Sequence, residues 1–111
     1  MIAVDTSALM AILLDEPEAD DCMVAIQEAG GLLISAGTMA ELIDGLGFEI
    51  VPLSAASARR IAAVYGCWGK GIHPAALNLG DCFAYDVAAE RNCRLLYVGS
   101  DFSRTDVRPV L

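Results

Sequence analysis

Four acidic residues that lie far apart in this sequence of 111 residues follow apolar runs or stand at the starts of predicted helices. Asp5 ends the apolar run IAV, and Glu41 falls in the first turn of a predicted helix. Asp81 opens another predicted helix directly after a glycine, and Asp101 follows the apolar run LLYV and a Gly-Ser turn. A carboxylate at the end of a buried strand is costly to desolvate unless it is hydrogen-bonded, paired or metal-bound. No Lys or Arg stands near Asp5 in the sequence, so its charge needs another partner.

Clustered carboxylates do not all remain ionised unless cations neutralise them. Carboxylate oxygens suit Mg²⁺ or Mn²⁺, and two such ions can activate water and stabilise the leaving oxygen in phosphodiester cleavage. Each acid also has a structural interpretation when it is taken alone: Glu41 and Asp81 fit helix-capping roles, and Asp101 could start a turn. Asp5 is the hardest to explain in this way: it could cap the helix that follows it, but Thr6 or Ser7 could take that role at lower cost.

The four acids can meet only if a sheet brings the ends of its strands together. Apolar runs predict strands, and helical spacing of apolar residues predicts helices between them. The predicted strands cover 2–5, 32–35, 48–53 and 94–99, and the predicted helices cover 6–16, 18–30, 54–68 and 81–92, with a further helix around the capping-box pair Thr38 and Glu41. Alternating strands and helices predict a single domain over 1–111, a three-layer α/β/α fold with a central, mostly parallel sheet. Active sites gather at the carboxyl ends of such strands.

The composition excludes several classes of protein. The net charge is −8, and the sequence shows no basic patch of the kind that a general nucleic-acid binder carries. The four cysteines do not have the spacing of a metal site, so we expect them to be reduced thiols. The apolar runs are too short to span a bilayer, and no basic segment precedes an apolar core at the N-terminus. We therefore expect a cytoplasmic protein with no membrane association. His73, the one histidine, is expected to anchor a loop.

Four segments of the chain share a recognisable pattern: VDTSALMAILLDEPEA, ISAGTMAE, HPAALNLGDCFAYDVAAE and LLYVGSDFSRTDV. Together they closely resemble the PIN-domain proteins, and specifically the VapC-type toxins of bacterial toxin–antitoxin pairs. The resemblance covers nearly the whole chain in the family's order. It implies a Mg²⁺- or Mn²⁺-dependent endoribonuclease toxin that cleaves structured RNA such as tRNA or rRNA. It also implies neutralisation by a VapB-like antitoxin, and a homodimer.

The resemblance assigns roles to individual residues. It places the family's four catalytic, metal-binding acids at Asp5, Glu41, Asp81 and Asp101. It gives supporting positions near the site to Thr6, Ser7, Asn78, Ser100 and Asp106. Arg104 and Arg108 are candidates for contact with RNA phosphates, ahead of Arg59, Arg60 and Lys70.

Two departures from the family pattern affect the interpretation. Ser100 stands where many relatives have Asp or Asn, which weakens a second metal position and supports an alternative function, a catalytically impaired PIN-like module that acts by binding protein partners. The stretch after Glu41 is also short, because relatives carry a longer helix and then a second helix there. We interpret this as either a deletion or a mobile stretch missing from the printed sequence, and favour the second.

Overall fold

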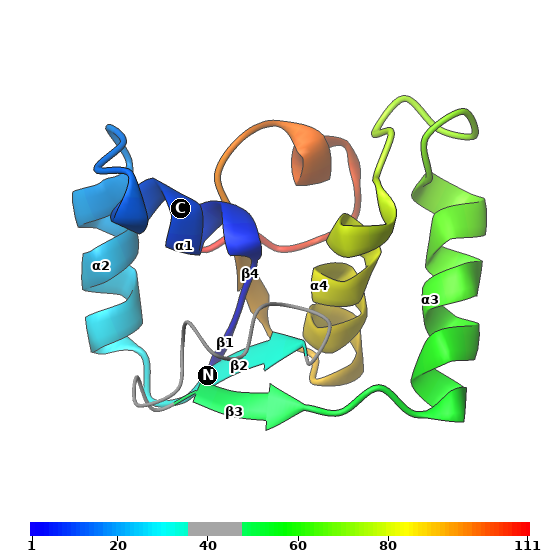
Figure 1. The fold of residues 1–111 in the computed structure, drawn as a ribbon, viewed down its shortest axis with the longest axis horizontal. Coiled ribbons are helices and arrows are strands. Elements are labelled where there is room, and N and C mark those ends of the chain that lie inside the picture. The colour runs from blue at the N-terminus through cyan, green and yellow to red at the C-terminus, as the bar shows by residue number, and fades with distance from the viewer. Residues whose placement is uncertain (36–47) are drawn as a thin grey trace.

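The computed structural model describes residues 1–35 and 48–111, in which four strands form one sheet. The strands are β1 (Ile2–Val4), β2 (Leu32–Ser35), β3 (Phe48–Val51) and β4 (Arg94–Leu96). Their order is β3-β2-β1-β4 and every pairing is parallel (Figure 1). The expectation of a parallel sheet is thus confirmed. With β1 in the interior of the sheet, its carboxyl end lies between the ends of β2 and β4.

Within residues 1–35 and 48–111, four helices lie between these strands in the predicted chain order. They are α1 (Thr6–Leu13), α2 (Ala19–Glu28), α3 (Ala55–Trp68) and α4 (Leu79–Glu90), and a short 3-10 helix, η2 (Asp101–Arg104), follows β4. The helix predicted around Thr38 and Glu41 lies outside the described residues. Figure 1 shows α1 and α2 on one side of the sheet and α3 and α4 on the other.

The two sides of the sheet carry separate hydrophobic clusters, because successive side chains of a strand point to opposite faces. Ala3, Leu33 and Leu95 belong to the cluster that contains the buried residues of α3 and α4. Ile2 and Leu96 belong to the cluster that contains residues of α1 and α2. Helices therefore cover both faces, and the three-layer α/β/α prediction is confirmed.

An ion pair between a buried carboxylate and a half-exposed guanidinium holds α3 against α4. Asp86 is 6% exposed and accepts two hydrogen bonds from Arg60, at 2.8 Å from Nε and 3.1 Å from Nη2. Arg60 Nε also lies 3.6 Å from Glu90 Oε2. Asp86 thus serves the packing of α4 against α3.

The C-terminal segment packs back onto β4. Phe102 is 2% exposed in the core, and Leu95 exchanges backbone hydrogen bonds with Arg108 and Val110 at 2.9 and 3.1 Å. A single parallel bridge joins Leu95 to Pro109.

All four cysteines are free thiols, as predicted. None of the helices within 1–35 and 48–111 has the length and apolar character that crossing a membrane requires.

Candidate active site

Asp5 lies at the carboxyl end of β1 and is the N-cap of α1. Its Oδ2 atom accepts hydrogen bonds from the Ser7 backbone N–H at 3.0 Å and from the Ser7 hydroxyl at 2.6 Å. The expectation that Thr6 or Ser7 would cap this helix is therefore wrong. The physical reason is that an Asp side chain is a better N-cap acceptor than Thr, and its position one residue before the helix lets it reach the Ser7 N–H. With 6% of its surface exposed, Asp5 depends on these bonds for its solvation.

Ser7 joins Asp5 to the neighbouring strand. Its Oγ donates to Asp5 Oδ2 and accepts a hydrogen bond from the Val98 backbone N–H at 3.0 Å. Val98 follows β4, and the Asp5 backbone N–H donates to Leu96 O at 3.0 Å. The ends of β1 and β4 are thus fixed to each other at the position of the Asp5 carboxylate, and Ser7 acts as a positioning residue.

Asp81 sits in the first turn of α4, within a reciprocal capping box. The Asn78 side-chain oxygen accepts a hydrogen bond from the Asp81 N–H at 2.8 Å, and Asp81 Oδ2 accepts one from the Asn78 N–H at 3.0 Å. Asp81 is buried, with 9% of its surface exposed. Asp81 can therefore serve both as a helix cap and as a site residue, because one carboxylate oxygen caps the helix and the other remains for the site.

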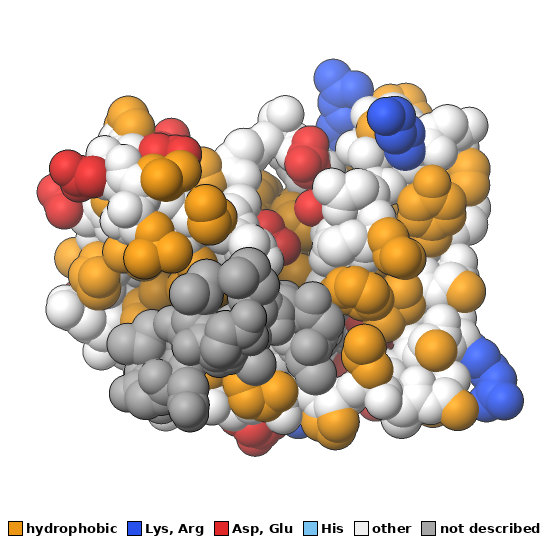
Figure 2. All heavy atoms as spheres, in the orientation of Figure 1, with side chains coloured by type: hydrophobic (Ala, Val, Ile, Leu, Met, Phe, Trp, Pro, Cys, Tyr) orange, Lys and Arg blue, Asp and Glu red, His pale blue; other side chains and the backbone are white. Residues whose placement is uncertain are grey.

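Two of the predicted acids, Asp5 and Asp101, act electrostatically on a third, Asp81. Burial raises the pKa of Asp81, the hydrogen bond from Asn78 opposes this rise, and the negative charges of Asp5 and Asp101 add to it. The carboxylates of residues 5, 81 and 101, far apart in the sequence, thus lie within electrostatic reach at one edge of the sheet. Figure 2 shows acidic side chains (red) in the hollow between the α1–α2 side and the α4 side of the molecule. Glu41, the fourth predicted acid, lies outside the described residues.

The donor set at this edge fits a hard divalent cation. Asp5 and Asp81 each use Oδ2 in hydrogen bonds, and the Oδ1 atom of each accepts none from the described residues. Mg²⁺ is commonly bound through one or two carboxylates and several waters. Within the part of the chain that the structure describes, no three His, Cys, Asp or Glu side chains form a group that could hold one ion. The described residues therefore offer Asp5 and Asp81 as a pair, with Asp101 nearby as a further charge.

The predicted supporting residues occupy different environments. Asn78 contacts Asp81 directly, as the capping box shows. Thr6 and Ser100 are exposed, and Ser100 forms no side-chain capping bond to η2. Asp106 accepts a hydrogen bond from the Tyr85 hydroxyl at 2.6 Å, which ties the C-terminal segment to α4.

His73 anchors the loop between α3 and α4. Its Nδ1 accepts a hydrogen bond from the Ala75 N–H at 3.0 Å, and its ring packs edge-on against Trp68 with the centroids 4.7 Å apart. Arg104 Nη1 donates to Pro74 O at 3.3 Å, so η2 contacts the same loop. The expected anchoring role of His73 is confirmed.

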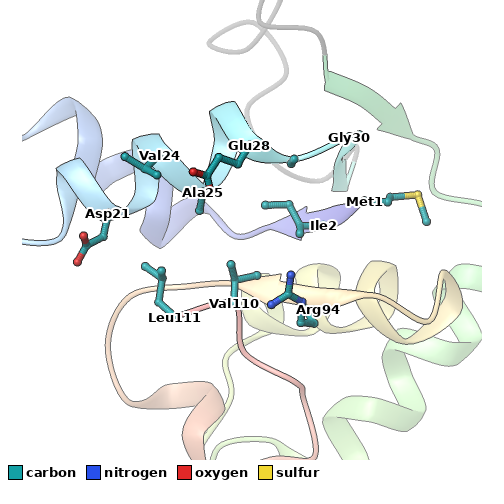
Figure 3. A pocket seen from close by; sticks show the side chains of 11 residues that line it. Met1, Ile2, Asp21, Val24, Ala25, Glu28, Gly30, Arg94, Val110 and Leu111 are labelled. Carbon is teal, nitrogen blue, oxygen red and sulfur yellow. The ribbon is translucent and has the colours of Figure 1, made fainter.

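A groove lies away from these acids. It has a volume of about 460 Å³ and runs between α2, the start of β4 and the C-terminal residues (Figure 3). Asp21, Glu28 and Arg94 are its charged lining residues. Because Arg94 is the first residue of β4 and pairs with Ile2 in register, the groove lies at the amino ends of the strands, opposite the candidate active site.

Known proteins with similar sequences identify the family. The chain is 35% identical over 128 residues to ribonuclease VapC28 of Mycobacterium tuberculosis, with 97% of this chain and 96% of that protein covered. It is 32% identical over 128 residues to ribonuclease VapC30 of the same species, with 98% of each covered. The chain belongs to the VapC ribonuclease family. No protein-family model matches the chain.

A solved structure supports the fold of this VapC-family chain. A toxin-antitoxin complex from Klebsiella pneumoniae matches with a TM-score of 0.73 and 20% identity, covering 96% of this chain and 93% of that one. At this level of identity the match shows the shared fold alone.

The VapC relatives are longer than this chain. An alignment of 128 residues against a chain of 111 leaves at least 17 residues of each relative without a counterpart here. The sequence pattern places the difference after Glu41, a segment outside the described residues, and that location stays a prediction.

Sequence reasoning missed one feature that shapes the site and ranked another wrongly. It did not foresee that Ser7 joins Asp5 to Val98, because the pairing spans 91 positions and no local pattern signals it. It allowed Asp5 as a cap of the helix that follows but ranked Thr6 ahead of it, although the Asp-x-Ser spacing at a helix start was a usable signal.

Proposed function

We propose that this chain is a Mg²⁺- or Mn²⁺-dependent endoribonuclease toxin that cleaves structured cellular RNA, either tRNA or rRNA, in the cytoplasm. The single observation that carries the proposal is the convergence of Asp5, Asp81 and Asp101 at the carboxyl edge of the sheet. Membership of the VapC ribonuclease family supports the choice of RNA as substrate.

Asp5 and Asp81 are the proposed metal-binding residues, with Asp101 and Glu41 completing the acidic site. A divalent cation held there would supply positive charge to the substrate phosphate and acidify a water molecule for attack. In the hydrolysis, the water oxygen forms a bond to phosphorus and the bond from phosphorus to the leaving ribose oxygen breaks. Ser7 fixes the Asp5 carboxylate and Asn78 fixes that of Asp81, so that neither must reorganise on binding the RNA.

A VapB-like antitoxin and a second copy of the chain are the proposed protein partners. The solved structure that matches this fold is a toxin–antitoxin complex, which supports the first of these. Co-expression with the antitoxin should suppress RNA cleavage, and the free protein should elute as a dimer in size-exclusion chromatography.

RNA cleavage by the purified, antitoxin-free protein tests the proposal. Total cellular RNA is incubated with Mn²⁺ or Mg²⁺, and the new 5′ ends are sequenced. Cleavage should be lost in Asp5→Asn and in Asp81→Asn, and retained in Asp20→Asn, which neutralises an exposed carboxylate in the first turn of α2. Circular dichroism confirms that each variant is folded.

The alternative function is a binding module without catalytic activity, which the exposed Ser100 favours because it offers no carboxylate beside Asp101. If wild type cleaves no RNA in the presence of Mn²⁺, the ribonuclease proposal fails and the binding module stands. Restoration of strong cleavage by Ser100→Asp would show that Ser100 is the cause.

A further inference from the structure

The basic residues of this chain are few enough to be accounted for individually. There are seven in all, none of which falls in residues 36–47, so the structure describes each of them. A nuclease must hold the RNA phosphates with some of these cations, because phosphate contacts dominate affinity for nucleic acid. A basic side chain is available to RNA if no carboxylate pairs with it and if it lies near the acids.

Two of the seven pair with carboxylates, and a third is held beyond the C-terminal end of α4. Arg60 pairs with Asp86, and Arg91 Nη2 lies 2.6 Å from Glu49 Oε2. Arg108 donates to the backbone and side-chain oxygens of Asn92 at 3.0 and 3.1 Å, beyond the C-terminal end of α4.

Two more lie away from the acids. Arg94 begins β4 at the amino edge of the sheet and lines the groove of Figure 3. Arg59 is exposed on α3, nine residues before Trp68 at the end of that helix. At a rise of about 1.5 Å per residue it lies about 14 Å back along the axis from the α3–α4 loop.

The remaining two stand on η2, which begins with Asp101, and on the loop that leads into the helix of Asp81. Arg104 is the last residue of η2, the 3-10 helix that begins with Asp101. Residues three apart in a 3-10 helix lie on the same side, yet no ion pair joins these two described residues. Lys70 lies in the α3–α4 loop, where its backbone N–H donates to Leu77 O at 3.0 Å, one residue before the Asn78 cap of the Asp81 helix.

One contact connects these two segments. Arg104 Nη1 donates to Pro74 O at 3.3 Å, within the loop that contains Lys70. Both side chains are exposed and neither pairs with a carboxylate in the part of the chain that the structure describes. Figure 2 shows basic side chains (blue) at the upper edge of the molecule, above the acidic side chains and where the α3–α4 loop lies in Figure 1.

We infer that Arg104 and Lys70 form the contact with the RNA phosphate backbone beside the acidic site. The inference rests on the proposed function, and it explains how a protein with a net charge of −8 can hold a polyanion. Carboxylates that hold a cation no longer repel the RNA. The exposed charges of Arg104 and Lys70, which pair with no carboxylate among the described residues, attract the phosphates next to the cleavage site. It also removes Arg108 from the predicted phosphate contacts, because its guanidinium is held by Asn92 beyond the C-terminal end of α4, whereas Asp81 lies in the first turn of that helix.

Binding of fluorescently labelled bulk tRNA tests this inference. Fluorescence anisotropy is measured with Ca²⁺ in place of Mg²⁺ or Mn²⁺, from 50 to 200 mM KCl, for wild type, Arg104→Gln and Lys70→Gln. Each substitution should raise Kd roughly tenfold, the equivalent of one charge-assisted hydrogen bond. Each should also reduce the slope of log Kd against log salt by about 0.7 to 0.9.

Matched variants separate charge from structure. Arg59→Gln removes an exposed cation on α3 and should leave Kd and the salt slope at the wild-type values. Arg104→Lys keeps the charge and should keep the wild-type salt slope, even though the hydrogen bond to Pro74 O is changed. A purely structural role for Arg104 would alter thermal stability without changing the salt slope.

The result that overturns the inference is a wild-type Kd and salt slope in both Gln variants, or equal losses in Arg59→Gln. Failure of wild type to bind tRNA at all also overturns it. A different outcome is that the two Gln variants bind tRNA more weakly, as expected, while wild type cleaves no RNA. That outcome would refute the proposed ribonuclease activity and leave the phosphate contact standing.

Discussion

Replacement of Ser7 by Ala tests the site most directly, because one hydroxyl group makes both of its linking hydrogen bonds. The substitution removes the 2.6 Å bond to the Asp5 carboxylate and leaves the Val98 N–H without its partner. A hydrogen bond to a charged group contributes about 1.5–3 kcal/mol to stability. The better helix propensity of Ala returns about 0.5 kcal/mol, and the Ser7 backbone N–H still donates to Asp5.

We therefore expect Ser7→Ala to lower the free energy of unfolding by about 2 kcal/mol. For a domain of this length, an entropy of unfolding of about 2.1 cal/mol/K per residue converts this loss to a fall in Tm of roughly 8 °C. RNA cleavage should fall as well, since Asp5 loses the bond that fixes its rotamer. Urea unfolding followed by circular dichroism measures the first effect, and the m-value should not change.

Two neighbouring variants serve as controls for Ser7→Ala. Thr6→Ala removes an exposed hydroxyl that forms no hydrogen bond to the described residues, so its stability should stay within about 0.5 kcal/mol of wild type. Ser7→Thr keeps the hydroxyl and should recover most of the stability. Equal losses in Thr6→Ala and Ser7→Ala, or no loss in Ser7→Ala, would refute the assigned role of this hydroxyl.

Three further predictions concern the metal, the α3–α4 ion pair and the thiols. Mn²⁺ at tenfold its Kd should stabilise wild type by about 1.4 kcal/mol, or roughly 6 °C in Tm, and should not stabilise Asp81→Asn; equal shifts in differential scanning fluorimetry would count against Asp81 as a ligand. Arg60→Gln should lower the urea midpoint more than Asp86→Asn does. Arg60→Gln leaves the buried Asp86 carboxylate without its partner, whereas Asp86→Asn leaves a half-exposed guanidinium that water can solvate. Burial raises the pKa of the Cys82 thiol to about 11, so a thiol reagent at pH 8 should label the exposed Cys67 rapidly and Cys82 only after unfolding; rapid labelling of Cys82 in the native protein would contradict its buried position.

The sequence was sufficient to predict the layers of the fold, because the relevant signals are local. Continuous apolar runs mark the parallel strands, and helical spacing with capping residues marks the helices. The predicted strand 2–5 corresponds to β1 (Ile2–Val4), and the predicted helix 54–68 corresponds to α3 (Ala55–Trp68) with Ser54 as its cap. The boundaries of the helix predicted at 81–92 were shifted, since Asn78 rather than Asp81 caps α4 (Leu79–Glu90).

The partners of individual polar side chains could not be predicted in the same way. Arg60 lies 26 positions from Asp86, and Ser7 lies 91 positions from Val98. Such pairs depend on how whole elements pack, and many pairings are compatible with the same sequence pattern. The same limit applies to the acids: their positions at strand ends and helix starts were predictable, whereas the electrostatic coupling of Asp81 to Asp5 and Asp101 required the folded chain.

Asp5 and Asp81 should respond to neutralisation with opposite signs, although both are buried acids at one edge of the sheet. The charge of Asp5 strengthens the bond from the Ser7 hydroxyl, so Asp5→Asn should destabilise the metal-free protein by roughly 1 kcal/mol.

Burial and neighbouring charges raise the pKa of Asp81 above its ordinary value of 3.8. A carboxyl whose pKa is raised by folding contributes stability below its unfolded pKa and loses it as pH rises through the folded pKa. At pH 7 the Asp81 charge is therefore destabilising, and Asp81→Asn, which can still accept the Asn78 N–H bond, should stabilise the protein in EDTA. Urea unfolding of both variants at pH 7 measures this contrast. If both variants lost stability, a hydrogen-bonding role would outweigh the repulsion at Asp81. A stabilised Asp81→Asn that no longer responds to Mn²⁺ would show that the same repulsion which weakens the metal-free fold provides the attraction for a cation.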